Sequence, residues 1–173
     1  MKSFITNTLQ AGKHILPFQV EGPNNGDLKS IFHQSRIQLY GLPPQHSLSA
    51  AWPFRIVLDR GWIVDFSSAT NSVGGWQEIG SLNIHFSISL SSEEDPQFIM
   101  TDVHNFTILK CERLTYNEPD IYAECGIVFT SQTGSELLVA AGTSPGSVSI
   151  RPPFSSDPFA PEFEMDKYKR HEI

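Results

Sequence analysis

The chain has 173 residues, of which 39% are hydrophobic and 18% charged, and its formal net charge of −7 fits a single acidic domain. That charge, without a cluster of Lys and Arg, argues against nucleic acid as a partner, because phosphate contacts need clustered basic side chains. No apolar run reaches the roughly 20 residues of a membrane-spanning helix, and the first residues lack the continuous apolar core of a signal peptide. The sequence therefore predicts a cytoplasmic protein without a membrane partner.

The first part of the chain gives weak local signals. The stretch from Phe4 to Leu16 is compatible with an irregular strand or with a weak helix, and its pattern does not separate the two. Asp27 is placed to cap a short helix from Leu28 to Arg36, in which Ile31 and Phe32 form one small apolar patch. Helical signals are otherwise few, so we expect at most one or two short helices.

Two hairpins are predicted. In residues 54–66, apolar and polar side chains alternate on both sides of Gly61, where glycine readily takes a positive φ. The second hairpin joins a strand from Ile121 to Thr130 with a return strand from Glu136 to Ala141. We expect the core face of its first strand to carry Ile121, Ala123, Cys125, Ile127 and Phe129.

Two longer strands are expected between these hairpins. From Leu82 to Leu90 every second residue is apolar, so His85 and its polar neighbours face outward. Residues 104–116 are apolar on both faces over part of their length, which is typical of a central strand covered on both sides.

Together these elements predict a mainly β fold, a single-domain antiparallel barrel-like or sandwich meander of roughly eight to ten strands. The domain is expected over residues 1–150, and residues 151–173, with four prolines, are expected to form a C-terminal strap packed on it. The basic run from Lys167 to Arg170 is interpreted as a solvated tail. The strap's expected aromatic anchors are Phe154, Phe159, Phe163 and Tyr168.

Neither the cysteines nor the histidines indicate a cofactor. Cys111 and Cys125 fall in predicted strands and are interpreted as free, inert thiols in a reducing compartment. The histidines are scattered, and only Asp102 and His104 would share one side of an extended segment, which is too few ligands for a metal. The sequence therefore predicts no metal and no cofactor.

The segment Gly142–Gly146 fits the G-x-S-x-G pattern of serine hydrolases. The residue after Ser144 is Pro145, which has no N–H to stabilise an oxyanion, and the following segment alternates like a strand where a hydrolase needs a helix. We therefore interpret the segment as a tight turn between two strands, and we predict no catalytic residue.

Five residues are candidates for a binding site. Trp52 and Trp76 flank predicted loops, where exposed tryptophan is typical of interfaces. Glu78 follows Trp76 closely, and Tyr122 lies two residues before Glu124. Such pairs of an aromatic and an acidic residue occur in carbohydrate sites and also on ordinary sheet surfaces.

Among these residues, Glu124 is predicted to be partly buried inside the barrel. A buried charge needs a partner, and Arg113 or Arg55 could supply it. We favour a structural ion pair over a functional acid at this position.

Two functions of different classes remain open. The first is a non-enzymatic interaction protein, for example an inhibitor or immunity-type protein, whose acidic surface attracts a protein partner. The alternative is a small-molecule-binding β-barrel, or an enzyme built on one, lined by Glu124, Tyr122, Trp76 and His85. Exposed edge strands would also allow two copies to pair, so a homodimer is a further expectation.

Overall fold

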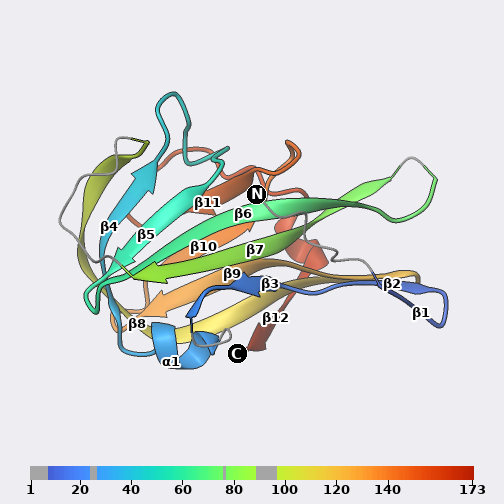
Figure 1. Ribbon diagram of the computed structural model, residues 1–173, viewed down its shortest axis with the longest axis horizontal. Coiled ribbons are helices and arrows are strands. Elements are labelled where there is room, and N and C mark those ends of the chain that lie inside the picture. The colour runs from blue at the N-terminus through green and yellow to red at the C-terminus, as the bar shows by residue number, and fades with distance from the viewer. Residues whose placement is uncertain (1–7, 24–26, 76, 89–96) are drawn as a thin grey trace.

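The computed structural model describes residues 8–23, 27–75, 77–88 and 97–173 and is mainly β, as predicted (Figure 1). Its described helical elements are α1 (Leu28–Phe32) and a short 3-10 turn, η2 (Met165–Lys167). The described strands are β1 (Thr8–Gln10), β2 (Lys13–Leu16), β3 (Gln19–Glu21), β4 (Arg36–Leu42), β5 (Phe54–Leu58), β6 (Trp62–Ser72), β7 (Glu78–Ile88), β8 (Ile99–Glu118), β9 (Ile121–Ser131), β10 (Glu136–Ala141), β11 (Val148–Arg151) and β12 (Tyr168–Glu172). No helix among the described residues is long and apolar enough to cross a membrane.

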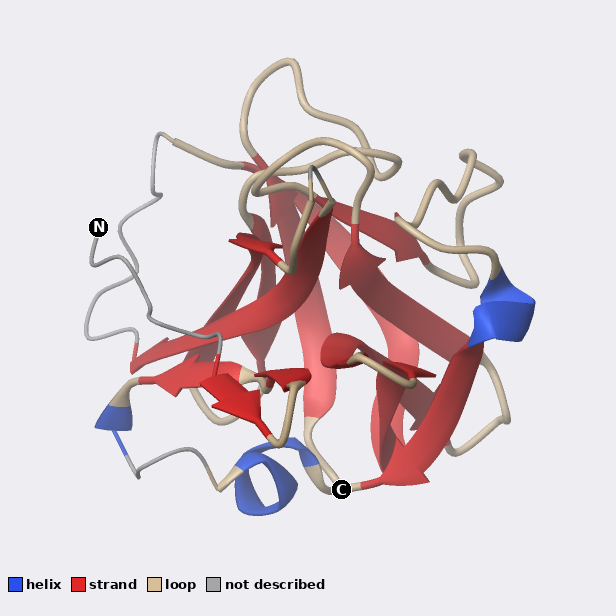
Figure 2. Ribbon diagram, turned by 90° about the vertical axis from the view of Figure 1, so that its right-hand side faces the viewer, coloured by secondary structure: helices blue, strands red, loops and turns tan. Residues whose placement is uncertain are grey.

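The strands form one curled, mixed sheet, a half-barrel, in the order β1-β2-β9-β8-β4-β5-β6-β7-β3. Three further strands lie off this path, because β10 pairs with β9, β11 with β10 and β12 with β8. Figure 2, which looks along the length of Figure 1, shows the strands curving around a shared interior. The sheet has more strands than the sequence predicts, and it is mixed because β2 and β3 run parallel to their partners.

The N-terminal segment bridges the two margins of the half-barrel. β2 and β3 are separated only by Pro17 and Phe18, yet β2 pairs with β9 and β3 pairs with β7. Proline has no N–H to give to a strand ladder, so Pro17 suits the point where the chain leaves one partner for the other. Over the described part of the N-terminal stretch, the open choice between strand and helix is therefore decided in favour of strand.

Both predicted hairpins are confirmed. β5 and β6 are antiparallel with Phe54 opposite Phe66, and Gly61 in their turn has φ +79°. β9 and β10 are joined by a turn in which Gly134 has φ +82°. Glycine adopts these left-handed values without the clash that a Cβ would bring.

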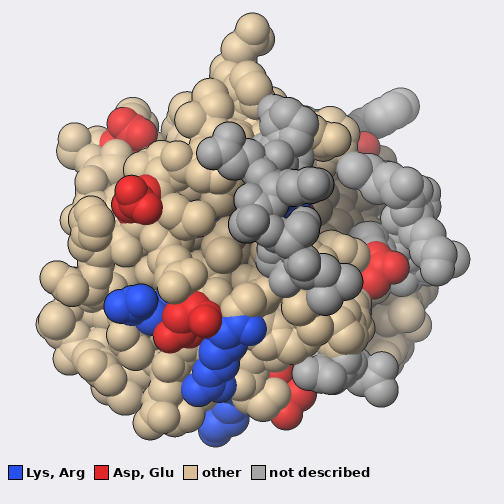
Figure 3. All heavy atoms as spheres, turned by 60° about the vertical axis from the view of Figure 1, so that its left-hand side comes forward, with Lys and Arg blue, Asp and Glu red and all other residues tan. Residues whose placement is uncertain are grey.

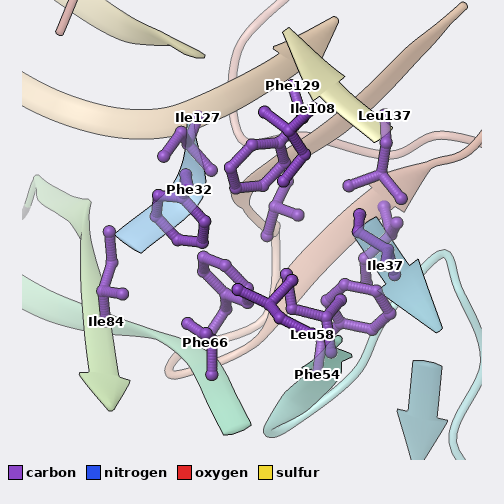
Figure 4. Packing of buried hydrophobic residues seen from close by; sticks show 14 of the residues in the cluster. Phe32, Ile37, Phe54, Leu58, Phe66, Ile84, Ile108, Ile127, Phe129 and Leu137 are labelled. Atoms are coloured by element: carbon purple, nitrogen blue, oxygen red, sulfur yellow. The ribbon is translucent and has the colours of Figure 1, made fainter. Parts of the chain in front are cut away.

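The first core fills the space between the two sides of the curled sheet. It is built on five phenylalanines that are each less than 2% exposed: Phe32, Phe54, Phe66, Phe86 and Phe129. Figure 4 shows Phe66 and Phe129 pointing toward one another from opposite sides, with ring centroids 6.2 Å apart. Aromatic side chains therefore occupy the interior of the half-barrel.

A second core lies on the opposite face of β9 and β10, and a β-bulge decides which residues reach it. Leu114 of β8 is opposite Gly126 while Thr115 is opposite Glu124, so Cys125 is an extra residue on β9. The expected single core face of β9 is therefore wrong. Ile121, Ala123 and Cys125 face the second core, whereas Ile127 and Phe129 face the first.

The chain after β11 crosses the second core. From here on, the strap means residues 152–167, the part of the predicted C-terminal segment that lies between β11 and β12. Its Phe159, Phe163 and Met165 pack against the second core. Phe154 differs from the other expected anchors, because it is 43% exposed and stacks on Tyr40, outside the second core.

The interpretation of residues 167–170 as a solvated tail is wrong. Tyr168 begins β12, which is antiparallel to β8, and its side chain is buried in the second core. Arg170 on the same strand binds Glu136, with Nη2 and Oε2 3.0 Å apart. The basic side chains flank a buried tyrosine, and the burial of its ring holds this segment against the domain in spite of the charged residues on either side.

Two further expectations fail, one at the end of the helix and one at a bulge within β8. The predicted helix ends at Phe32, because Gln34 has φ +59° and β4 begins at Arg36; Asp27 caps it, accepting from Ser30 N–H at 3.2 Å. The expected burial of residues 104–116 on both faces fails at Leu109, which is 51% exposed because it is the bulged residue between Ile108 and Lys110.

Candidate functional site

The predicted binding residues do not converge on one site. Tyr122 and Glu124 lie together on β9, whereas Trp52 lies in the loop between β4 and β5. Glu78 is the exposed first residue of β7, and Trp76 lies outside the described residues. The structure therefore separates an interior cluster around Glu124 from a surface site around Trp52.

The interior cluster holds a carboxylate that is almost fully withdrawn from water. The Glu124 side chain is 9% exposed. Its Oε1 accepts from Arg113 Nη1 at 2.7 Å and from the Tyr122 hydroxyl at 3.1 Å, and its Oε2 accepts from the Phe18 N–H at 2.6 Å. The predicted partner Arg113 is confirmed, whereas Arg55 pairs with Asp65.

This cluster fixes the place where the N-terminal segment changes partner. Phe18 lies between β2 and β3, so its N–H is outside both ladders and is satisfied by the Glu124 carboxylate. The Arg113 guanidinium also lies 5.2 Å from the centroid of the Phe18 ring. Burial and the Glu124 charge raise the pKa of Tyr122, so its hydroxyl stays a donor at neutral pH. These contacts give Glu124 a structural role at the bridge.

His85 does not join this cluster. Its Nδ1 lies 3.8 Å from Glu21 on the neighbouring strand β3, and its side chain is 52% exposed. Of the four residues expected to line a ligand-binding barrel, Tyr122 and Glu124 lie together, His85 lies beside Glu21, and Trp76 is outside the described residues.

The surface site is a shallow depression of about 290 Å³ beside an exposed tryptophan. We call it the Trp52 surface; it is lined by Pro43, Trp52, Pro53, Arg55, Asp65, Gln97 and Phe98. The Trp52 side chain is 48% exposed, which is unusual for so large an apolar group.

Trp52 is held in place from two directions. Its backbone N–H donates to His46 Nδ1 at 3.0 Å. One side of the indole lies against Gly146, where an added Cβ would be 3.6 Å from the ring atom Cε2. The ring is therefore positioned by the protein while almost half of the residue remains in contact with solvent.

A charged pair lies beside the tryptophan. Arg55 makes a bidentate contact with Asp65, with Nε–Oδ1 and Nη2–Oδ2 distances of 2.7 and 2.9 Å. The guanidinium carbon lies 3.8 Å from the centroid of the Phe98 ring, so arginine is fixed by both a carboxylate and an aromatic face. This arrangement was not predicted, although both residues lie in the predicted hairpin, where the structure places Arg55 opposite Asp65.

The G-x-S-x-G segment forms a turn next to this surface. Gly146 has φ +80°, the Gly142 N–H donates to Ser147 O at 2.9 Å, and the exposed Ser144 is followed by β11. The interpretation as a turn between two strands is confirmed.

The residues considered for metal binding or thiol chemistry lie outside the Glu124 cluster and the Trp52 surface. Asp102 and His104 line a separate open depression with Arg36 and Gln38. Within the described ranges, no three His, Cys, Asp or Glu side chains are grouped so that they could hold a metal ion. Both cysteines are free, and burial raises their thiol pKa values well above the ordinary range, as expected of inert thiols.

Comparisons of this chain with protein-family models, curated proteins and solved structures give no match. The functional inference therefore starts from the geometry of the Trp52 surface and of the two cores.

Proposed function

We propose that this chain is a non-enzymatic interaction protein that binds a protein partner through the Trp52 surface. The observation that carries the proposal is the exposed indole, which lies against Gly146, while the Trp52 backbone N–H is held by His46. Positioned tryptophans are typical binding hot spots, because a large apolar ring is buried with little loss of conformational entropy.

The polar groups around the indole support a specific contact. Arg55 and Asp65 are 13% and 19% exposed, so they present a fixed pair of charges at the wall of the depression. An aromatic centre with a partly exposed polar wall resembles the general anatomy of protein interfaces.

The packing of the interior favours a surface site over a site inside the barrel. The five phenylalanines that are less than 2% exposed occupy the space between the two sides of the sheet. The polar cluster on the inner face of β9 has both carboxylate oxygens of Glu124 engaged by protein donors.

The net charge of −7 indicates the kind of partner. An acidic protein associates faster with a basic protein surface, because the attraction acts over the Debye length of about 8 Å at physiological salt. On the face drawn in Figure 3, the acidic and basic side chains of the described residues stand in small groups separated by uncharged surface. We propose a basic protein as the partner, for example the target of an inhibitor or immunity-type protein.

The test is affinity capture from the source cells with three baits: the wild-type chain, Trp52→Ala and Phe154→Ala. Phe154 is the matched control, because it is also an exposed aromatic residue, at 43%, but lies outside the Trp52 surface. We expect Trp52→Ala to weaken the dissociation constant of the purified pair about thirtyfold, the effect of a hot spot. We expect Phe154→Ala to leave it nearly unchanged. A partner that binds wild type and Trp52→Ala equally well would contradict the proposal.

The salt dependence of the same pair tests the charge of the partner separately. We expect the association rate to fall steeply as salt rises, while the dissociation rate changes less. An association rate that is the same at low and high salt would remove the basic partner from the proposal and leave the Trp52 surface in place.

A further inference from the structure

The strap holds a carboxyl group of its own against the second core. The Glu162 side chain reaches β7, where Oε2 accepts from the Gly80 N–H at 2.8 Å. Gly80 makes this approach possible, because a Cβ there would lie 3.1 Å from that oxygen and 2.8 Å from the Ala141 Cβ. The Glu162 carboxyl is therefore inserted at a close contact between β7 and β10.

The backbone of the strap is fastened at three places around this carboxyl. The Ala160 N–H donates to Ser149 Oγ at 2.9 Å, the Glu162 N–H to Ala141 O at 2.8 Å, and the Phe163 N–H to the Tyr168 hydroxyl at 3.2 Å. The Phe163 ring also stacks on Tyr116, with centroids 3.9 Å apart. Glu162 lies in the middle of this short fastened segment, so the state of its carboxyl bears on all of these contacts.

In the described part of the chain, the groups that face the carboxyl supply no compensating positive charge. The titratable groups that face it are Tyr116 on β8, Cys125 on β9 and Tyr168 on β12, and burial raises the pKa of each. All three are therefore uncharged near neutral pH. Glu164 and Asp166 on the strap itself are exposed acids. Among the described residues, no Lys, Arg or His side chain forms an ion pair with Glu162.

A carboxyl group in such a place is stable when it is neutral. One backbone N–H is a single donor, whereas an ionised carboxylate in water is solvated on all of its lone pairs. Ionisation inside the strap therefore costs free energy that the chain can recover by moving the carboxylate back into water.

We propose that the strap is a pH-dependent latch, in which the protonated Glu162 carboxyl holds residues 159–163 closed over the second core and its ionisation loosens them. The proposal is independent of the partner that binds the Trp52 surface.

The direction of the pH effect follows from proton binding in the two states. Burial raises the pKa of Glu162 from 4.5 to about 7, and the Gly80 N–H opposes this only in part. A released strap returns the carboxyl to its ordinary value, so the released state binds fewer protons than the closed state. The release equilibrium therefore rises up to about tenfold per pH unit between 4.5 and 7 and becomes level above 7.

The experiment is amide hydrogen exchange followed by NMR from pH 4.5 to 8, with each rate divided by the intrinsic rate at that pH. The reporters are the N–H groups of Gly80, Glu162 and Phe163, and amides of β5 and β6 report global unfolding. We expect the protection of the three reporters to fall up to about tenfold per pH unit below pH 7 in the wild-type chain and then to stay level.

Two variants identify the group that titrates. Glu162→Gln keeps an acceptor for the Gly80 N–H but cannot ionise, so its protection should not change with pH. Glu164→Gln is the matched control, because it removes an exposed acid two residues away on the same strap, and it should behave like wild type. Wild-type protection that is independent of pH, or a pH dependence that survives in Glu162→Gln, would overturn the latch.

A direct titration tests the proposal without any variant. The ¹³C chemical shift of the Glu162 carboxyl should change with a midpoint near 7. A midpoint near its ordinary 4.5 would show a solvated carboxylate at neutral pH and would overturn the latch.

Discussion

Glu124 is buried and Glu162 is partly buried, but the fold treats their charges in opposite ways. Counted over the described residues, Glu124 receives three donors, one of them the Arg113 guanidinium, whereas Glu162 receives a single backbone N–H. Burial alone therefore does not decide whether a carboxylate is tolerated inside this protein. Whether the charge is tolerated depends on the hydrogen-bond donors that neighbouring strands place around the carboxylate.

The difference originates in where each residue lies in the fold. Glu124 is on β9 next to β8, and regular pairing places the long Arg113 side chain within its reach. Glu162 lies in the strap, outside the strand ladders, and the hydrogen bond that its carboxyl accepts among the described residues comes from the Gly80 backbone. The first arrangement stabilises one fixed structure, and the second gives the strap a dependence on pH.

The largest expected effect comes from making the Glu124 region resemble the Glu162 region. Arg113→Ala leaves the carboxylate buried without its cation and should lower the free energy of unfolding by about 2–3 kcal/mol, because an uncompensated buried charge is costly. The control is Arg170→Ala, which breaks the exposed ion pair between Arg170 and Glu136, whose side chains are 35% and 32% exposed. This variant should lower the free energy of unfolding by at most about 1 kcal/mol. Urea unfolding at pH 7 measures both. Equal losses of unfolding free energy in the two variants would mean that burial does not increase the contribution of the Arg113–Glu124 pair to stability.

A smaller effect is expected from opening the cover over Glu162. Phe163→Ala removes the ring stacked on Tyr116 and should destabilise the chain by about 2 kcal/mol. Water that enters beside the strap should also lower the pKa of Glu162 toward 4.5, as carboxyl NMR would record. Phe154→Ala, at an exposed strap position, should change neither quantity appreciably. A Glu162 midpoint that stays near 7 in Phe163→Ala would show that other groups keep water from it.

The smallest effect concerns the charge of Glu162 itself. Its pKa is higher in the folded than in the unfolded chain, so its ionisation lowers stability as pH rises from 4.5 through 7. The free energy of unfolding of Glu162→Gln, relative to that of wild type, should therefore rise by about 1–2 kcal/mol from about pH 5 to about pH 8. The rise is smaller than for a fully buried group, because the Glu162 carboxyl is partly solvated. Urea midpoints at the two pH values measure this gain. Glu164→Gln should show none, and a gain in both variants would point to a general reduction of negative charge.

Local pattern was enough to predict the elements that form by pairing with their neighbours in sequence. The β5–β6 and β9–β10 hairpins follow from period-2 alternation around a glycine. The burial of Glu124 was also predicted, and the need to pair a buried charge left Arg113 or Arg55 as its partner, of which the structure shows Arg113. The alternation pattern failed at Cys125, because a single bulged residue reverses which side chains of β9 face each core from that point on. The sequence pattern itself shows no sign of the bulge.

Long-range placement depended on contacts that no short segment contains. The parallel pairing of β2 with β9 and of β3 with β7, the insertion of Glu162 beside Gly80, and the position of Trp52 over Gly146 each join residues far apart in the chain. The sequence by itself determined a mainly β chain, its two hairpins and the turn at Ser144, since these follow from backbone preferences and side-chain alternation. Only the tertiary structure decided which buried acid is neutralised by arginine and which is left to a proton. That choice depends on the donors that distant strands and the strap bring within hydrogen-bonding distance.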